Sequence, residues 1–290
     1  MRFRNFFARF AALSVFAWAG AAQAQPYDTS RIVSIGGSIT EIVYALGEEA
    51  RLVARDTTSV YPEAALALPD IGYIRALSPE GVLSVDPTLI ISLEGSGPPD
   101  AIEVLRKASV PMVEVPETFD REGIMEKIRI VGEVLGVEDK ARRLAEETDA
   151  DIRAAESATS GIENRKKVLF VLSMQGGRIL ASGIGTAADG IISMAGGVNA
   201  VTGYQGYKQI SDEAVIEAAP DIILVMNRGG DHATRVGDIL ANQALATTPA
   251  GRDEHIVSVD GAFLLGFGPR TAAAVRQLSS EFYGDQTGAD

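Results

Sequence analysis

The sequence contains no cysteine and only two histidines, His232 and His255. Without cysteine the chain can form no disulfide, no thiolate metal site and no thiol nucleophile. Two histidines are too few for a histidine-rich metal site, and the G-x-S-x-G motif of many serine hydrolases is absent. The composition therefore gives no support to an enzyme; a secreted enzyme stays an alternative that would require a catalytic constellation the sequence does not show.

The chain also lacks an apolar run of about twenty residues, the length that a membrane-spanning helix requires. Its apolar stretch AALSVFAWAGA follows three arginines and precedes the small-residue sequence AQA. This three-part pattern predicts a signal peptide over residues 1–24, cleaved after Ala24. Because no cysteine follows the stretch, we do not expect a lipid-anchored lipoprotein. The pattern indicates a secreted protein.

Basic residues are few: 26 Lys and Arg stand against 39 Asp and Glu, for a net charge of −13. Removal of the signal peptide makes the charge more negative, since that segment contains three arginines and no acid. Nucleic acids and anionic lipids are attracted to basic surfaces. We therefore expect neither as a partner.

From Arg31 onward, short apolar runs alternate with stretches of helical periodicity, which is typical of a parallel α/β sheet. The predicted strands of the first half are 31–35, 51–56, 88–92 and 111–115, and the predicted helices are 38–47, 78–86 and 98–109. The pattern restarts in the second half, with strands 167–173, 178–183 and 221–226 and helices 185–197 and 211–219.

Between the halves, residues 118–167 are charged and contain no strand pattern. Ile124, Ile128, Val131 and Leu135 recur at helical spacing, so we interpret the segment as one long helix with a break, if any, near Gly136. Residues 78–91 also align without gaps on residues 211–224. The sequence thus predicts two similar α/β lobes around a ligand cleft: a lobe over 25–118, an interlobe helix over 119–165 and a lobe over 166–290.

The stretch GIGTAA, residues 183–188, matches the G-x-G-x-x-A dinucleotide fingerprint. That fingerprint requires an acid about twenty residues further on, and the region around 203–209 contains none. We therefore interpret these glycines as a strand-to-helix turn.

Glu80 and Glu213 occupy equivalent positions of the repeat, each two residues after a serine. Ser78 and Ser211 are suited to cap the helices that follow them, and an acid in the first turn favours the helix dipole. Capping accounts for both glutamates locally, and a functional role for the pair remains the alternative.

Tyr73 and Arg75 lie on a predicted loop, between the Pro-Asp of residues 69–70 and the helix start at Ser78. A nearby cation favours the phenolate form of tyrosine, and tyrosine is one of the known axial ligands of haem iron. The residue types permit an iron ligand, and they equally permit an ordinary loop tyrosine whose ring covers an apolar patch.

Taken together, these features resemble the haem-binding periplasmic proteins of bacterial haem-uptake ABC transporters. These belong to a wider group with two lobes joined by one helix, which includes cobalamin- and siderophore-binding proteins. The resemblance covers nearly the whole mature chain, from RIVSIGGSITEIVYALG through VLSVDPTLIIS and AAPDIILVM to GFGPRTAAAV, and LPDIGYIRALSPEGVLS resembles the haem branch.

The resemblance implies a monomeric periplasmic carrier that binds haem as cargo and delivers it to an inner-membrane permease. Tyr73 would be the axial iron ligand, and Arg75 would bind its phenolate or a haem propionate. Glu80 and Glu213 would dock on arginines of the permease, one in each lobe. Loop position adds Tyr204, Tyr207, Lys208 and Arg228 as haem surroundings. A carrier of ferric siderophores or cobalamin is the alternative.

Some members of the haem branch supply a second axial ligand, a histidine, from the C-terminal lobe. Here the corresponding LSMQGGR contains Met174 and Gln175 instead, which favours five-coordinate iron; His232 is a weak candidate for the ligand. A continuous interlobe helix also predicts only a small change of the angle between the lobes on binding.

Overall fold

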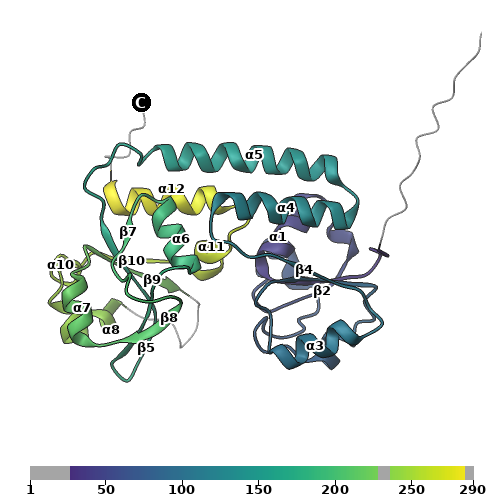
Figure 1. The fold of residues 1–290 in the computed structure, drawn as a ribbon, viewed down its shortest axis with the longest axis horizontal. Helices are drawn as coiled ribbons and strands as arrows, with labels where there is room; N and C mark the ends of the chain where they lie inside the picture. Colours follow the sequence, from purple (N-terminus) through teal and green to yellow (C-terminus); the bar gives the residue numbers. More distant parts are fainter. Residues whose placement is uncertain (1–26, 228–235, 285–290) are drawn as a thin grey trace, which may run out of the picture.

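The computed structural model describes residues 27–227 and 236–284. Two α/β lobes lie side by side, and long helices run along one side of both (Figure 1). Each lobe has its own sheet, so the predicted two-lobed α/β fold class is confirmed. Within the described residues, no helix is long and apolar enough to cross a membrane. The predicted signal peptide, Arg228 and His232 lie outside the described residues.

The N-terminal lobe is built on a four-stranded parallel sheet with the order β2-β1-β3-β4. Its strands are β1 (Ile32–Ile35), β2 (Leu52–Arg55), β3 (Leu89–Leu93) and β4 (Met112–Val115), and its helices are α1 (Gly37–Ala45), α2 (Pro79–Leu83) and α3 (Pro99–Lys107), with short 3-10 turns at Glu49–Arg51 and Glu63–Ala67. Ile39 of α1 packs on one face of the sheet, while Val82 of α2 and Leu105 of α3 pack on the other. Both faces are covered, which is why all four residues of β1 are buried and three of them are apolar.

The C-terminal lobe contains a six-stranded mixed sheet, in which β10, β9, β5, β6 and β8 lie in that order and β7 pairs with β5. Its strands are β5 (Lys167–Gln175), β6 (Arg178–Ser182), β7 (Val198–Asn199), β8 (Tyr207–Ile210), β9 (Ile222–Asn227) and β10 (Ile256–Asp260). Its helices are α6 (Ala187–Met194), α7 (Asp212–Ala218), α8 (Val236–Ala241), α9 (Gln243–Ala246), α10 (Pro249–Arg252), α11 (Gly261–Leu265) and α12 (Thr271–Tyr283).

Strands β5 and β6 form an antiparallel hairpin, although the alternating pattern predicts mainly parallel strands. Gly176 and Gly177 join them, with φ angles of 56° and 77°. Two consecutive residues with positive φ match the right-handed twist of a hairpin, and glycine adopts them without steric cost. Gly176 and Gly177 are therefore the feature of the sequence that indicates the antiparallel hairpin.

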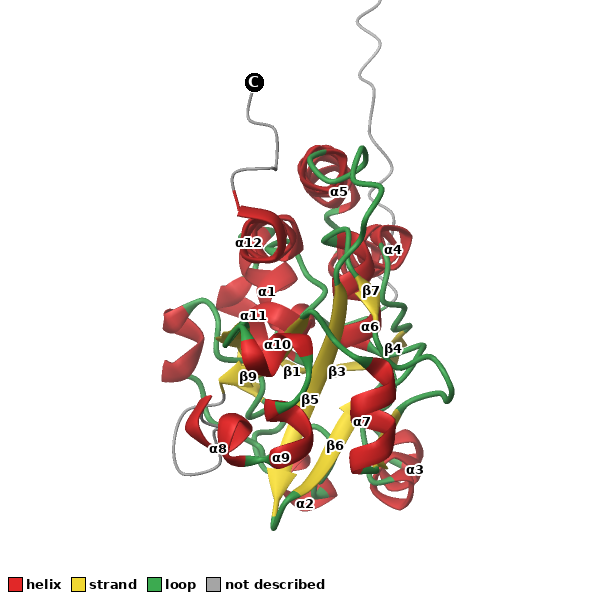
Figure 2. Ribbon diagram, turned by 90° about the vertical axis from the view of Figure 1, so that its left-hand side faces the viewer, coloured by secondary structure: helices red, strands yellow, loops and turns green. Residues whose placement is uncertain are grey.

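The segment predicted as one interlobe helix consists of two helices, α4 (Arg121–Leu135) and α5 (Glu138–Ser157). The chain reverses at Gly136, in the left-handed conformation with φ 68°. Gly132 allows the close approach of the two helices, because a Cβ there would lie 2.1 Å from that of Ala141. The predicted break is therefore a complete reversal, and α4 and α5 form an antiparallel pair. Helix α5 also packs against α12 (Figure 2).

Candidate functional site

The carboxyl ends of the four parallel strands of the N-terminal lobe meet at one edge of the sheet. In open α/β sheets this edge is where ligands bind. The loop after β2 is held rigidly there by Asp56. One carboxylate oxygen accepts hydrogen bonds from the amide of Gly36, at 2.9 Å, and from the Ser59 hydroxyl, at 2.7 Å. The other accepts from the amide and the hydroxyl of Thr58, at 2.9 and 2.6 Å.

Tyr73 and Arg75 lie on a turn that is docked on this edge. The amide of Thr57 donates to the Gly72 carbonyl at 2.9 Å, and the amide of Gly97 donates to the Ile74 carbonyl at 2.9 Å. Ile74 is buried, whereas Tyr73 is 46% exposed and Arg75 is also exposed. The buried isoleucine anchors the turn, so its two neighbours face outward. Both side chains are thus exposed on a turn whose main chain is held by hydrogen bonds.

Three charged side chains lie near this turn. The amide of Glu117 donates to a carboxylate oxygen of Glu94 at 3.0 Å, and Glu117 accepts a hydrogen bond from the Lys127 ammonium at 2.6 Å. Burial raises the pKa of Glu117, and the neighbouring charge of Glu94 adds to the rise, while Lys127 and the more distant Arg75 oppose it. Arg75 is therefore close enough to Glu117 for its positive charge to act on that carboxyl.

Tyr204, Tyr207 and Lys208 lie in the C-terminal lobe, at or before the edge strand β8. The Tyr204 hydroxyl donates to the Ala181 carbonyl at 3.0 Å, and the Lys208 ammonium lies 5.3 Å from the centre of the Tyr204 ring. Burial raises the pKa of Tyr204, opposed by a hydrogen bond with the Lys208 main chain. Tyr207 is half-buried, with its ring 6.4 Å from that of Phe170. These contacts give both tyrosines structural roles in their own lobe.

Glu80 and Glu213 are exposed in the first turns of α2 and α7. The predicted caps are confirmed: Ser78 Oγ accepts from the amide of Gly81, and Ser211 Oγ accepts from that of Ala214, both at 3.3 Å. Hydrogen bonds hold the pKa of both carboxyls below the usual value, from the Ser78 side chain for Glu80 and mainly from its own amide for Glu213. Each glutamate is a fixed, exposed negative charge on its lobe.

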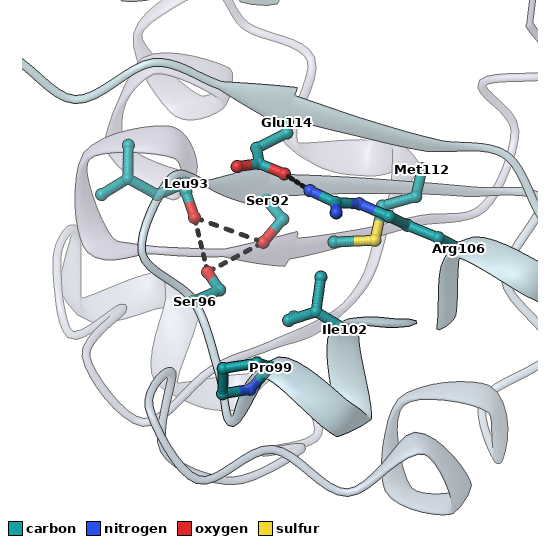
Figure 3. A pocket seen from close by; sticks show the side chains of 8 residues that line it. All are labelled: Ser92, Leu93, Ser96, Pro99, Ile102, Arg106, Met112 and Glu114. Atoms are coloured by element: carbon teal, nitrogen blue, oxygen red, sulfur yellow. Dashed lines mark hydrogen bonds and ion pairs between the residues drawn. The ribbon is translucent and has the colours of Figure 1, made fainter. Parts of the chain in front are cut away.

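Away from this turn, the described residues also line two hollows. One, of about 190 Å³, lies between α3 and strands β3 and β4; Ser92 and Ser96 are hydrogen-bonded to each other at its wall, and Arg106 pairs with Glu114 (Figure 3). The other, of about 530 Å³, is lined by residues of α4, α5 and α6. Tyr73 and Arg75 line neither of them.

The remaining sequence motifs make local structural contacts. Residues 183–188 form the predicted strand-to-helix turn, where Thr186 caps α6 by accepting from the amide of Asp189 at 3.0 Å. His255 lies before β10, with Nε2 3.1 Å from the Glu281 carbonyl oxygen. No group of three or more His, Cys, Asp or Glu suited to a metal ion occurs in residues 27–227 and 236–284.

Residues 32–262 match the family model described as periplasmic binding protein. Among solved structures, the chain is similar to the periplasmic haem-binding protein BhuT in complex with two haems, at 39% identity over 89% of this chain and 99% of that one, with a TM-score of 0.83. The periplasmic haem-binding protein RhuT from Roseiflexus sp. RS-1 is 39% identical over 90% of this chain and 100% of that one, with a TM-score of 0.84. A vitamin B12-binding protein of Vibrio cholerae is 25% identical over 88% of this chain and 90% of its own length.

Proposed function

The chain belongs to the periplasmic binding protein family, and from this membership and the site we propose that it binds haem in the periplasm and delivers it to an ABC importer. The similarity to two periplasmic haem-binding proteins at 39% identity supports haem over cobalamin, because the cobalamin-binding relative is only 25% identical. We propose that the ligand is bound and released unchanged, so that the chain acts as a carrier and not as an enzyme.

The observation that carries the proposal is the exposed Tyr73 on its anchored turn, two residues before Arg75. An iron ligand must be accessible and must hold its position without reorganising. The hydrogen bonds to Thr57 and Gly97 provide that support. A phenolate is an anionic oxygen donor for ferric haem, and the exposed Arg75 guanidinium would bind the iron-bound phenolate or a haem propionate.

The C-terminal lobe would contribute surface to the bound haem. Tyr204 is already hydrogen-bonded to Ala181, and burial disfavours its phenolate, so it is a poor iron ligand. Lys208 is exposed and would meet a propionate, Tyr207 would contribute its ring, and Arg228 remains a proposed contact. Met174 and Gln175 are part of β5, and with no histidine beside them we propose five-coordinate iron.

Delivery would use Glu80 and Glu213, one exposed carboxylate on each lobe. Their fixed positions in the first turns of equivalent helices suit a pair of docking points for arginines of an inner-membrane permease. The acidic surface gives no support to nucleic acid as a partner, and we propose that the carrier acts as a monomer.

The test is a titration of the mature protein with haemin, followed in the Soret region, for the wild type, Tyr73→Phe and Tyr204→Phe. We expect the wild type and Tyr204→Phe to saturate with a tyrosinate-type ferric spectrum, which Tyr73→Phe lacks. Phenylalanine keeps the ring and removes only the oxygen, so loss of the spectrum assigns the iron ligand. A wild type that binds cobalamin or a ferric siderophore, and not haemin, would overturn the proposal.

A further inference from the structure

The C-terminal lobe contacts the N-terminal lobe through the segment 266–270, which follows α11. Arg270 reaches α1 of the other lobe and binds Glu41 twice: its amide donates to Oε1 at 3.0 Å, and its Nε donates to Oε2 at 2.8 Å. Gly268 lies against the same carboxylate, since a Cβ there would be 3.3 Å from Glu41 Oε1. The backbone and the side chain of this segment thus converge on one buried glutamate.

The Arg270 guanidinium also lies between two aromatic rings. Its Cζ is 3.6 Å from the centre of the Tyr61 ring, on the loop after β2, and 5.3 Å from the centre of the Phe263 ring, on α11. Cations are attracted to aromatic faces at such distances. One side chain therefore joins α1 and the β2 loop of the N-terminal lobe to α11 and α12 of the C-terminal lobe.

Glu41 depends on this partner. The residue is only 8% exposed, and burial raises the pKa of its carboxyl, while the charge and hydrogen bonds of Arg270, and the charge of Lys127 on α4, oppose the rise. A buried carboxylate that loses its partner is strongly unfavourable. The pair is therefore stable only while the two lobes are in contact at this point.

We propose that Arg270 is a positioning residue that latches the two lobes together through Glu41 and Tyr61, in addition to the α4–α5 pair. The latch sets the separation of the lobes, and its effect on haem rests on the proposed function. Phe119 supports the same contact from the segment before α4, with its ring 5.3 Å from that of Phe267 in an edge-on arrangement. Tyr73 would meet its ligand at a lobe separation that the latch has already set.

The latch can be tested without any ligand. The chain has no cysteine, so Val104→Cys on α3 and Ile216→Cys on α7, both more than half exposed, accept spin labels at defined positions in the two lobes. We expect Arg270→Gln to broaden or shift the distance between the labels measured by pulsed electron paramagnetic resonance. The matched control is Arg106→Gln, which removes an arginine–glutamate pair within one lobe and is expected to leave the distance unchanged.

Tyr61→Leu is the second variant, since it removes the stacked ring but leaves the Glu41 carboxylate paired and should fold. We expect a smaller broadening from it. If Arg270→Gln fails to fold, the distance distribution of Tyr61→Leu alone tests the latch. A wild-type distance distribution in the variants that fold would overturn the latch, whether or not the protein binds haem.

The haem measurement follows on the same proteins. We expect Arg270→Gln to release haem about tenfold faster than the wild type, within the usual range of coupling between sites. Its ferric spectrum should stay that of the wild type, because Arg270 acts through the lobes and not on the iron. A changed spectrum would overturn the positioning role and make Arg270 a ligand contact. Failure of the wild type to bind haem would reject the proposed function and leave the distance result intact.

Discussion

Burial decides what each tyrosine is suited to do. Tyr204 donates its hydroxyl hydrogen to a carbonyl and is partly desolvated, so its neutral form is favoured. Tyr73 is exposed beside Arg75, with its main chain held by the neighbouring loops. The same side chain is thus a structural donor in one lobe and a candidate anionic ligand in the other.

Lys127 shows the cost of a buried charge. Its side chain is inaccessible to solvent, and its ammonium pairs with Glu117 at 2.6 Å. Burial lowers the pKa of Lys127, and pairing with Glu117 opposes that change. Each member of the pair is therefore needed to keep the other charged inside the protein.

We predict that Lys127→Met lowers the free energy of unfolding by about 3–5 kcal/mol near neutral pH, because it leaves the largely buried Glu117 carboxylate without its ion-pair partner. Burial already raises the pKa of Glu117, and without Lys127 the rise is larger. An acid whose pKa is raised by folding stabilises the fold below its unfolded pKa, and this contribution is lost as the pH rises through the folded pKa. The decrease in the free energy of unfolding caused by Lys127→Met should therefore become smaller towards pH 4.

Urea unfolding of Lys127→Met between pH 4 and 8 measures this effect. The double variant Lys127→Met/Glu117→Gln is the control, since it removes both charges, and we expect it to recover most of the lost stability near neutral pH. A loss of equal size at every pH would contradict the explanation based on the Glu117 carboxylate.

At the scale of elements, two serine-capped helices recur in equivalent places. Helix α2 leads into β3 and helix α7 leads into β9, as the internal repeat predicts. The α4–α5 pair has no counterpart in the repeat, and it depends on two glycines. Gly136 reverses the chain, and Gly132 lets the helices touch.

We predict that Gly132→Ala lowers the free energy of unfolding by about 1–3 kcal/mol, because the new methyl would overlap that of Ala141. Gly136→Ala should cost about 1–2 kcal/mol through its left-handed backbone. Chemical denaturation measures both changes. Gly161→Ala is the matched control, since a Cβ there meets no atom within 4 Å, and a loss as large as that of Gly132→Ala would count against the packing argument.

At the scale of the molecule, the lobes are connected in more than one way. The α4–α5 pair replaces the predicted single helix, and α5 packs on α12 of the C-terminal half. The Glu41–Arg270 contact adds a second connection. The expectation of a small change in lobe angle on binding therefore rests on α5, which is continuous over Glu138–Ser157, together with these contacts. The same spin-label pair with and without haem measures the change.

We predict that Glu80→Ala and Glu213→Ala each reduce haem transport by the reconstituted importer, and that the double variant reduces it further. Haem affinity should not change, because neither carboxylate belongs to the Tyr73 turn. The helices should persist as well, since Ser78 and Ser211 still cap them. Transport into proteoliposomes and a haemin titration, run in parallel, separate docking from binding. Asp100→Ala, an exposed acid in the first turn of α3, is the control, and an equal loss from it would contradict specific docking.

The sequence predicted what depends on neighbours along the chain. Apolar runs and helical periodicity placed the main strands and helices, and serine caps marked α2 and α7. Strands β7 and β8 were not predicted: β7 has only two residues, and the YKQI of β8 contains two polar residues and forms no apolar run. The β5–β6 hairpin and the reversal at Gly136 each depend on one or two glycines. A glycine indicates that the chain can turn, but the packing of the flanking elements decides in which direction it continues.

The sequence by itself determined the α/β class, the two related halves and the placement of Tyr73 and Arg75 on one loop. Only the tertiary structure decided that Ile74 is buried while Tyr73 and Arg75 are exposed. It also decided that the Tyr204 hydroxyl donates a hydrogen bond to the Ala181 carbonyl. It also decided that Glu41 meets Arg270, 229 residues further along the chain. No local pattern encodes such a contact, because it exists only when segments far apart in the chain are brought together in the folded molecule.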